Sequence, residues 1–465
     1  MIENNQKEVS SLTKHPEGSV RELLYLSLPL MLSLLSENIM LFFDRLILAH
    51  YSLDAMNAAA AASFFCCILQ YATVAIAAIS EIFVGQFNSS GQKGKASWPV
   101  WQMIWFSLFS FMIFIPAALW GGDYLLSPYH KEEFALPYYQ WFLYFGPFFT
   151  LVAAFSGFFI GIGKTKVVTI TVILGNLFNI ALDVLLIFGV PGMIPSMGTK
   201  GAAIATGISQ LLQVVVLAAI FFNASHRKRY NTLDCTARPK LFSKCLRIGS
   251  PNAVGYMMEM TCWAFIARLA ASKGEDFITV LTVGQSIYTL LAFALDGIQR
   301  GVCMTSASFL GSNKKEHVVK TWKSASKVIF LIAGVFSIFL VFYPDPLIKQ
   351  FLTSEIHSEN YQNTLYLLQM SSIIIWLYII IDGHSCISTG VLIASGDIAY
   401  VLIVDIIYIC FFTFLPIYVL TTYFDSSPLV IWTTVTAASF LDASLNYFRF
   451  RQNKWSAREP ITREQ

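Results

Sequence analysis

The chain has 465 residues, of which 56% are hydrophobic and only 13% are charged. A soluble domain carries roughly 25% charged residues, and with so few charges a soluble fold would have to expose large apolar patches. The composition therefore excludes a soluble protein and predicts an integral membrane protein. The net charge of +3 is too small to indicate a nucleic-acid partner.

The first 20 residues are polar and mixed in charge, so we expect no cleavable signal peptide. The eight cysteines form no CxxC motif and no cluster with histidine. We therefore expect neither a zinc site nor a disulfide framework, and interpret most cysteines as small buried apolar side chains.

Apolar segments of the length that crosses a bilayer, about 20 residues, follow one another along the chain. They predict an all-α membrane protein with about twelve transmembrane helices, at residues 23–48, 56–86, 98–120, 134–160, 167–190, 200–223, 245–271, 277–310, 318–343, 362–393, 398–421 and 428–450.

Lysine and arginine are concentrated at the two ends of the chain and in every second loop, whereas the alternate loops hold about one basic residue each. Cytoplasmic loops are the ones enriched in basic residues. We therefore expect a multi-pass protein of the plasma (inner) membrane with both termini in the cytoplasm.

The longest polar break, residues 223–247, divides the chain near its middle. We predict an N-terminal lobe at 1–222, a cytoplasmic linker at 223–247, and a C-terminal lobe with a basic tail at 248–465. A shift of 222 residues places Pro29 on Pro251 and Glu37 on Glu259. Two six-helix bundles in the same orientation are expected, related by a pseudo-two-fold axis along the membrane normal.

The first apolar helix carries Glu37 and Asp44, which are seven residues apart and therefore point from nearly the same face. A carboxylate in hydrocarbon costs several kcal/mol, so both should face the protein interior or a water-filled cavity. Pro29 in this helix and Pro251 in its counterpart are candidate kink positions.

Further oxygen-bearing side chains lie later in the N-terminal half. Asn179 and Asp183 are four residues apart on one helix face, and Thr206 lies within the next helix. With Asp44 they suit a desolvated sodium ion or a shared proton, because two adjacent carboxylates cannot easily both stay ionised. The alternative for Asn176 and Thr206 is simple helix–helix hydrogen bonding.

In the C-terminal half the corresponding candidates are Glu259, Tyr378 and Asp382, the last two spaced one turn apart. Asp296 and Arg300 are spaced i, i+4 and are interpreted first as a structural ion pair. Asp405 and Asp442 have no partner visible in the sequence, and Asp405 is the stronger additional candidate.

Several segments in order along the chain resemble the multidrug and toxic compound extrusion (MATE) transporters, in particular the NorM-like branch. They are FFDRLILAHYS (42–52), VGQFNSSGQKGKA (84–96), GNLFNIALDVLLIFG (175–189), KGAAIATGISQ (200–210), GSPNAVGYMMEMTCWAF (249–265) and IDGHSCISTGVLIASGD (381–397).

The resemblance implies two bundles in a V around a central cavity, and export of organic, often cationic compounds in exchange for Na⁺ or H⁺. It places Asp44, Asn179, Asp183 and Thr206 on cation-binding positions of the first lobe, and Glu259, Tyr378 and Asp382 on those of the second. The expected partners are small organic substrates, a coupling cation and the lipid bilayer, with a monomeric protein and no cofactor.

Two positions depart from the family pattern. Asp183 stands where branches with second-lobe acids usually have Asn, and Glu37 stands where Gln is common. Alternatives within the same fold are a flippase for a lipid-linked precursor and an exporter of organic acids. No HExxH or DDxxD-like motif occurs and the seven histidines are dispersed, so we do not expect an enzyme.

Overall fold

The computed structural model describes residues 13–122, 134–349, 361–424, 426–453 and 455. These residues are overwhelmingly helical, and the one β feature among them is an isolated bridge between Val190 and Ile194. The predicted all-α class is confirmed.

Ten helices or short helical segments precede the middle of the chain. They are α1 (Val20–Tyr51), α2 (Leu53–Ala78), α3 (Ser80–Ser89), η1 (Lys93–Lys95), α4 (Ser97–Pro116), η2 (Ala117–Gly121), α6 (Ala135–Tyr144), α7 (Gly146–Gly161), α8 (Thr165–Phe188) and α9 (Gly198–Phe221), counted over the described residues.

The short α10 (Ala224–Tyr230) follows, and then the second half. Its elements are α11 (Pro239–Lys273), α12 (Glu275–Gly311), α13 (Lys315–Ser337), η4 (Ile338–Phe342), α14 (Asp345–Ile348), α15 (Tyr361–Ala394), α16 (Ile398–Ile406), η5 (Ile407–Phe414), α17 (Leu415–Tyr423) and α18 (Val430–Arg451).

Within the described residues, ten helical runs are long and apolar enough to cross a membrane. The other two predicted spans are helices α11 and α18, of 35 and 22 residues. They are less apolar, because α11 begins in the basic linker and α18 carries Thr, Ser, Asp and Asn. One predicted span breaks at Phe145, just before Pro147, which sits in the first turn of α7 where a missing N–H is tolerated.

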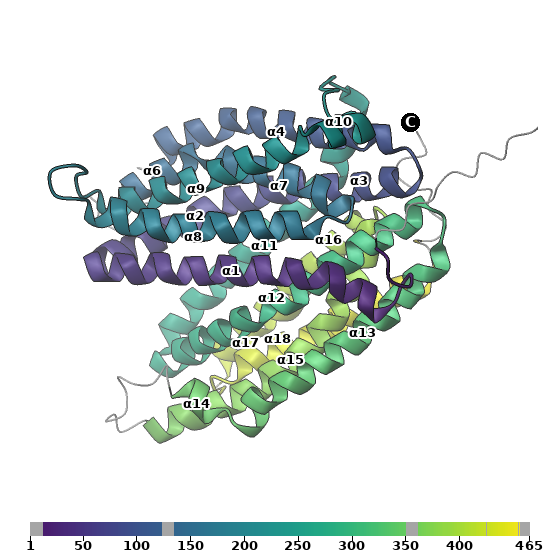
Figure 1. Ribbon diagram of the computed structural model, residues 1–465. Coiled ribbons are helices and arrows are strands. Elements are labelled where there is room, and N and C mark those ends of the chain that lie inside the picture. Colours follow the sequence, from purple (N-terminus) through teal and green to yellow (C-terminus); the bar gives the residue numbers. More distant parts are fainter. Residues whose placement is uncertain (1–12, 123–133, 350–360, 425, 454, 456–465) are drawn as a thin grey trace, which may run out of the picture.

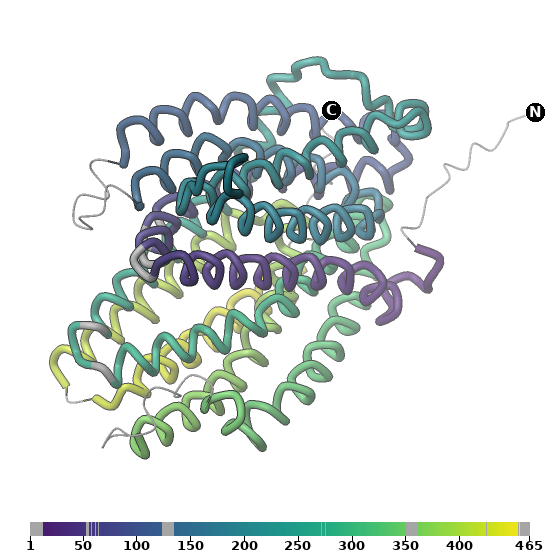
Figure 2. The backbone as a smooth tube through the Cα atoms, turned by 60° about the vertical axis from the view of Figure 1, so that its left-hand side comes forward, coloured from purple at the N-terminus to yellow at the C-terminus, as the bar shows by residue number. Residues whose placement is uncertain are grey.

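The helices form two bundles (Figure 1). The first half of the chain, α1 to α9, makes one bundle and α12 to α18 make the other, while α11 packs on α2 and α4 as well as on α12 and α16. The bundles meet at the end that holds α10 and the starts of α1 and α13. They diverge toward the end that holds the α8–α9 loop, and the turned view separates the same two groups (Figure 2).

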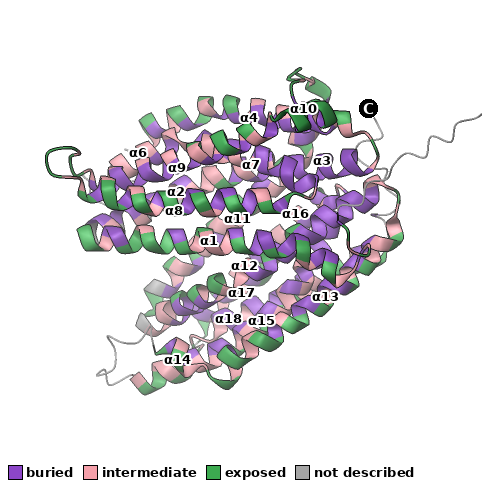
Figure 3. Ribbon diagram, viewed as in Figure 1, coloured by how far each residue is buried: buried purple, intermediate pink, exposed green. Residues whose placement is uncertain are grey.

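The meeting end is closed by direct packing of α1 and α3 on α12. A Cβ on Gly301 would collide with Ser27 of α1, and one on Gly311 would collide with Ser89 of α3, so glycine is required for the close approach. Gln86 also donates to the Ala394 carbonyl across 3.1 Å. One continuous core runs through both bundles here, and Figure 3 shows buried residues concentrated on this side.

The segment before α1 ties the two bundles together at the same end. Glu17 pairs with Lys314, and its Oε2 lies 2.9 Å from His317 Nε2 at the start of α13. Ser324 of α13 donates to the Gly18 carbonyl across 2.7 Å. Separating the bundles at this end would break all of these contacts.

The predicted linker is an ordered segment attached to the first bundle. Trp98 Nε1 of α4 donates to Asp234 Oδ2 across 2.8 Å, and Trp101 Nε1 donates to the Thr232 carbonyl across 2.9 Å. The Arg238 guanidinium lies 3.8 Å from the Trp98 ring centre. The linker therefore fixes the start of α11 against α4.

His226 anchors α10 beneath the α7–α8 turn. Its Nδ1 lies 2.8 Å from the Ile220 carbonyl oxygen and its Nε2 lies 2.8 Å from Lys164 Nζ. The carbonyl accepts the Nδ1 proton, so Nε2 of a neutral ring accepts from the lysine. Burial lowers the pKa of His226 below its ordinary 6.5, and the adjacent Lys164 lowers it further.

This arrangement predicts a pH-dependent contribution to stability. The unfolded chain binds the His226 proton more readily than the folded protein, so the contribution is complete above pH 6.5 and is lost as pH falls through the lowered pKa. We expect the thermal midpoint of the purified protein to fall more steeply between pH 7.5 and 5 in the wild type than in His226→Gln. Glutamine still accepts from Lys164 but does not titrate, so equal slopes would contradict the assignment.

Candidate functional site

Three helices of the first bundle bring the predicted N-terminal residues together. Asp44 lies on α1, Asn179 and Asp183 on α8, and Thr206 on α9, and α8 packs against both α1 and α9. Asn179 and Asp183 are completely buried and Thr206 is 6% exposed. The i, i+4 spacing on α8 places the amide and the carboxyl group on the same side, toward Asp44.

Asp44 and Asp183 form the centre of this group. Their carboxyl groups lie within hydrogen-bonding reach of each other. Apart from Asp44, neither oxygen of Asp183 has a hydrogen-bond partner, and no ion pair among the described residues includes either acid. Two carboxylates this close in a protein interior require a shared proton or a bound cation.

The Asn179 amide joins Asp44 to α9. Its nitrogen donates to Asp44 Oδ1 across 3.0 Å, and its oxygen accepts from the Thr206 backbone N–H across 3.2 Å. The amide therefore stabilises a charged Asp44 carboxylate.

Other polar residues of these helices have structural roles. Asn176 Nδ2 donates to Ser36 Oγ across 2.9 Å, which joins α8 to α1. The Pro29 carbonyl accepts from Ser33 at 3.0 Å and from Thr169 at 2.6 Å. Neither Pro29 nor Pro251 interrupts its helix, since α1 and α11 are each assigned as one continuous helix.

Glu37 lies apart from the Asp44 group. It is solvent-exposed on α1 and its electrostatic partner is Arg300 of α12, in the other bundle. Arg300 is also within electrostatic range of Glu81, Asp296 and Tyr256. Arg300 and Asp296 are exposed although they lie in mid-helix, so water reaches the face between the bundles.

The predicted Asp296–Arg300 ion pair is wrong, because no ion pair within 4.0 Å joins these residues in the described part of the chain. The arginine instead lies among acids of both bundles. Glu81, which sequence reasoning missed, is 9% exposed and its Oε1 has no hydrogen-bond partner. The sequence did offer a signal for Glu81, since it is the single acid in the apolar run 72–87. It lies close to the end of the predicted span 56–86, where a charged residue can reach water.

In the second bundle a tyrosine joins two predicted residues. Tyr288 of α12 donates to Asp382 Oδ2 across 2.9 Å, and its ring centre lies 4.9 Å from that of Tyr378. Glu259 of α11 lies within electrostatic range of Asp382. Tyr288 was missed because nothing in its own helix marks it, and its role depends on the packing of α12 on α15.

Two more acids, Asp405 and Asp442, lie near Asp382 and Glu259 in the second bundle. Asp405 of α16 lies within electrostatic range of Glu259, Asp382 and Asp442. Asp442 of α18 is 8% exposed and accepts hydrogen bonds from Ser385 and Asn446. Asp405 lies just before the π-helix η5, a helix type that is frequent at functional sites. No group of three or more His, Cys, Asp or Glu suited to a metal was found among the residues described.

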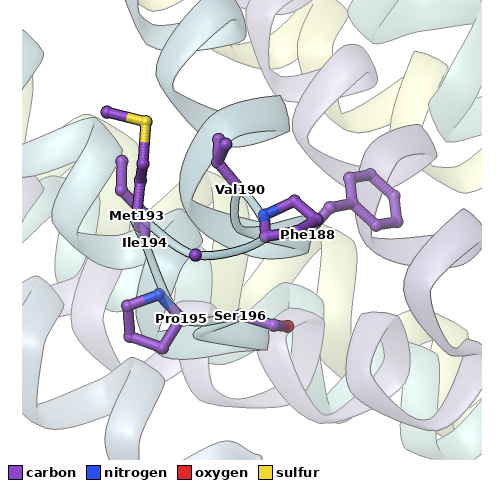
Figure 4. Close-up of a pocket in the computed structure, with 8 residues that line it drawn as sticks. Phe188, Val190, Met193, Ile194, Pro195 and Ser196 are labelled. Atoms are coloured by element: carbon purple, nitrogen blue, oxygen red, sulfur yellow. The ribbon is translucent and has the colours of Figure 1, made fainter.

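A pocket of about 460 Å³ lies in the α8–α9 loop, between Phe188 and Ser196 (Figure 4). Its lining includes Met193 and Pro195 and no charged side chain. The pocket lies at the diverging end of the bundles, away from the buried acids, and we assign it no role.

Comparison with known proteins gives consistent results. The MatE family model matches residues 29–185 and 251–420. The probable multidrug resistance protein NorM of Thermotoga maritima is 24% identical, over 96% of this chain and 95% of that protein. The probable multidrug resistance protein YoeA of Bacillus subtilis is 23% identical, over 99% of each chain.

Solved structures share the fold. The crystal structure of a MATE protein carrying a proline-to-alanine substitution has a TM-score of 0.84 at 16% identity, over 95% of this chain and 97% of that one. The outward-facing conformation of a multidrug resistance MATE family transporter has a TM-score of 0.81 at 16% identity, over 98% and 100%. Because the family model covers most of both halves, and both bundles have counterparts, this chain belongs to the MatE family and is a NorM-like multidrug and toxic compound extrusion (MATE) transporter.

Proposed function

We propose that this protein is an antiporter that exports organic, often cationic compounds in exchange for Na⁺ or H⁺ by alternating access. The observation that carries the proposal is the contact between Asp44 and the buried Asp183, neither of which has an ion-pair partner within 4.0 Å in the described residues, although Arg45 lies within electrostatic range of Asp44. A small cation or a proton is the species that would stabilise this pair. The family membership and the names of the relatives support the export of drugs.

Coupling follows from a difference in ion affinity between two arrangements of the bundles. An ion bound at Asp44 and Asp183 favours the arrangement in which α1, α8 and α9 hold these side chains together. Asn179 holds Asp44 in this arrangement, since its amide nitrogen donates to Asp44 Oδ1 across 3.0 Å. Substrate favours the other arrangement, and the difference in affinity drives the population shift.

The side chains on the facing sides of the two bundles favour cationic cargo, because most of the charged ones are acids. Glu37 on α1 and Asp296 on α12 are exposed on facing helices, and Asp382, Asp405 and Glu259 lie deeper in the second bundle. Arg300 is the one cation within electrostatic range of Glu37 and Asp296 that the described residues provide. A flat aromatic cation could also contact Tyr256 and Tyr288 by stacking and cation–π interactions.

The basic loops favour one orientation of the protein in the membrane. The end at which the bundles meet holds the basic segments around α10 and the start of α13, and we call it the basic end. If the basic end lies in the cytoplasm, the bundles are joined on the cytoplasmic side and diverge toward the outside. Such an arrangement is open toward the outside. We place the protein in the plasma (inner) membrane as a monomer with both termini cytoplasmic.

Replacing Asp44 with Asn tests the coupling site of the first bundle. Asparagine keeps the size and hydrogen bonding but cannot carry the exchanged charge. We expect the initial rate of dye-cation export from proteoliposomes to fall at least roughly tenfold, because allosteric coupling is typically worth about 1–3 kcal/mol. Export is measured with imposed Na⁺ and H⁺ gradients in separate experiments.

Glu316→Gln, on the exposed first turn of α13, is the matched control and should leave export unchanged. The folded state of each variant is checked by size-exclusion chromatography and thermal midpoint. Normal gradient-driven export by a folded Asp44→Asn protein would refute the mechanism.

Tyr288→Phe tests the second bundle. The substitution removes the 2.9 Å hydrogen bond to Asp382 and the contact of the same hydroxyl with Tyr378, so we expect reduced coupled export with dye binding retained. Asp382→Asn should have a larger effect in the same direction. Binding is followed by dye fluorescence polarisation and export by the vesicle assay.

The matched control is Tyr366→Phe, at an exposed position near the start of α15. Equal effects of Tyr288→Phe and Tyr366→Phe on export would show that the tyrosine–carboxylate contact has no part in coupling.

A further inference from the structure

A buried polar group lies between α15 and α18, one turn beyond Asp382. We call Ser385, Asp442 and Asn446 the Asp442 site. Ser385 donates to Asp442 Oδ2, and Asn446 Nδ2 donates to Asp442 Oδ1 across 3.0 Å and to Ser385 Oγ across 3.1 Å. The three residues are 4%, 8% and 0% exposed. A carboxyl group is therefore enclosed by protein with only neutral donors around it.

No cation balances Asp442 within the described residues. On its own helix, Arg449 is paired with Asp397, with 2.8 Å between Arg449 Nε and Asp397 Oδ2. On α15, His384 contacts Ser326 and the Ile380 carbonyl. The remaining charged groups that face Asp442 from the helices packed around it are acids: Asp382 on α15, Asp405 on α16 and Glu259 on α11.

The titratable tyrosines around the site also supply no positive charge. Tyr400 of α16 donates to the Leu445 carbonyl across 3.0 Å, and Tyr408 of η5 lies within electrostatic range of Asp442. A charged carboxylate buried without a counter-ion is strongly unfavourable. The site must therefore hold a proton or a cation.

Asn446 distinguishes between these two. Its Oδ1 is buried and has no hydrogen-bond partner, although Nδ2 of the same amide bonds to Asp442 and Ser385. A proton on Asp442 would neutralise the carboxyl group but leave this oxygen unsatisfied. A cation would bind the carboxylate and the Ser385 hydroxyl oxygen once the Asn446 amide turns its Oδ1 toward them in place of Nδ2, and these hard oxygen ligands suit sodium.

We propose that Ser385, Asp442 and Asn446 form a sodium-binding site separate from the Tyr288–Asp382 group. The single carboxylate matches a monovalent ion. Ser385 follows Asp382 by one turn in the direction of Ala394, where α15 ends near the Asp397–Arg449 pair. The site thus lies between Asp382 and the basic end of the protein, on a polar strip formed by α15 and α18.

The role of this ion in transport rests on the proposed antiport, whereas the binding itself does not. In the antiport, sodium reaching Asp382 from the diverging end would pass through the Asp442 site before release at the basic end. Asp442 would then bind sodium in addition to the ion bound at Asp44 and Asp183 in the first bundle.

The test measures binding of ²²Na⁺ to the full-length protein in lipid nanodiscs at pH 8, with choline chloride holding the ionic strength. We expect Asp442→Asn to bind one equivalent fewer than the wild type. Asn446→Leu should weaken the affinity of that equivalent at least tenfold. Ser444→Ala is the matched control. Ser444 is exposed on the same helix, and its hydroxyl donates to the carbonyl of Phe440, one turn earlier, across 2.6 Å.

Asp382→Asn should retain the equivalent that Asp442→Asn loses. A second measurement is the rise in thermal midpoint on replacing choline with sodium, which should be smaller in Asn446→Leu than in Ser444→Ala, since a ligand of the folded state stabilises it. Unchanged sodium binding in both Asp442→Asn and Asn446→Leu overturns the inference.

The outcomes separate this inference from the proposed function. Loss of sodium binding in Asp442→Asn together with absent dye export in the wild type would support the site and refute the antiport. Sodium-driven export with identical sodium binding in wild type and Asp442→Asn would refute the site and support the antiport.

Discussion

The structure depends on keeping carboxyl groups inside a protein that spans a low-dielectric membrane. Asp44 and Asp183 face each other in the first bundle, and Asp382, Asp405 and Asp442 line the second. Each group can be accommodated only with hydrogen-bond donors, a proton or a cation. The helices around them supply donors sparingly: one tyrosine to Asp382, and one serine and one amide to Asp442. The remaining stabilisation has to come from an exchangeable species, which is the physical basis of an ion-coupled transporter.

The packing limits where the two bundles can move. At the basic end, close helix approach at Gly301 and Gly311 and the Glu17 contacts hold them together. The linker does not act as a loose tether, because Trp98 and Trp101 attach it to α4. Relative motion must therefore be taken up within the long helices that contact both bundles, above all α11, which packs on α2 and α4 as well as on α12 and α16.

Local sequence patterns predicted the fold class, and they named several of the acids that the structure brings together. The twelve predicted apolar segments all fall on helices, ten of which are long and apolar enough to cross a membrane within the described residues. The spacing of Asn179 and Asp183 placed both on one face. The same reasoning was wrong for Asp296 and Arg300, since i, i+4 spacing makes an ion pair possible without excluding partners on other helices. Arg300 lies within range of Glu37 and Glu81 of the other bundle, and competition from a second bundle leaves no trace in the spacing along one helix.

The sequence by itself determined which side chains must avoid lipid, because the cost of a carboxylate in hydrocarbon is a property of the residue and its apolar surroundings. Tertiary structure alone decided which of these side chains meet. Tyr288 reaches Asp382, Ser385 and Asn446 enclose Asp442, and Glu37 lies away from Asp44. Those pairings depend on how helices far apart in the chain are rotated and packed against one another, and helical periodicity within one segment carries no information about its neighbours.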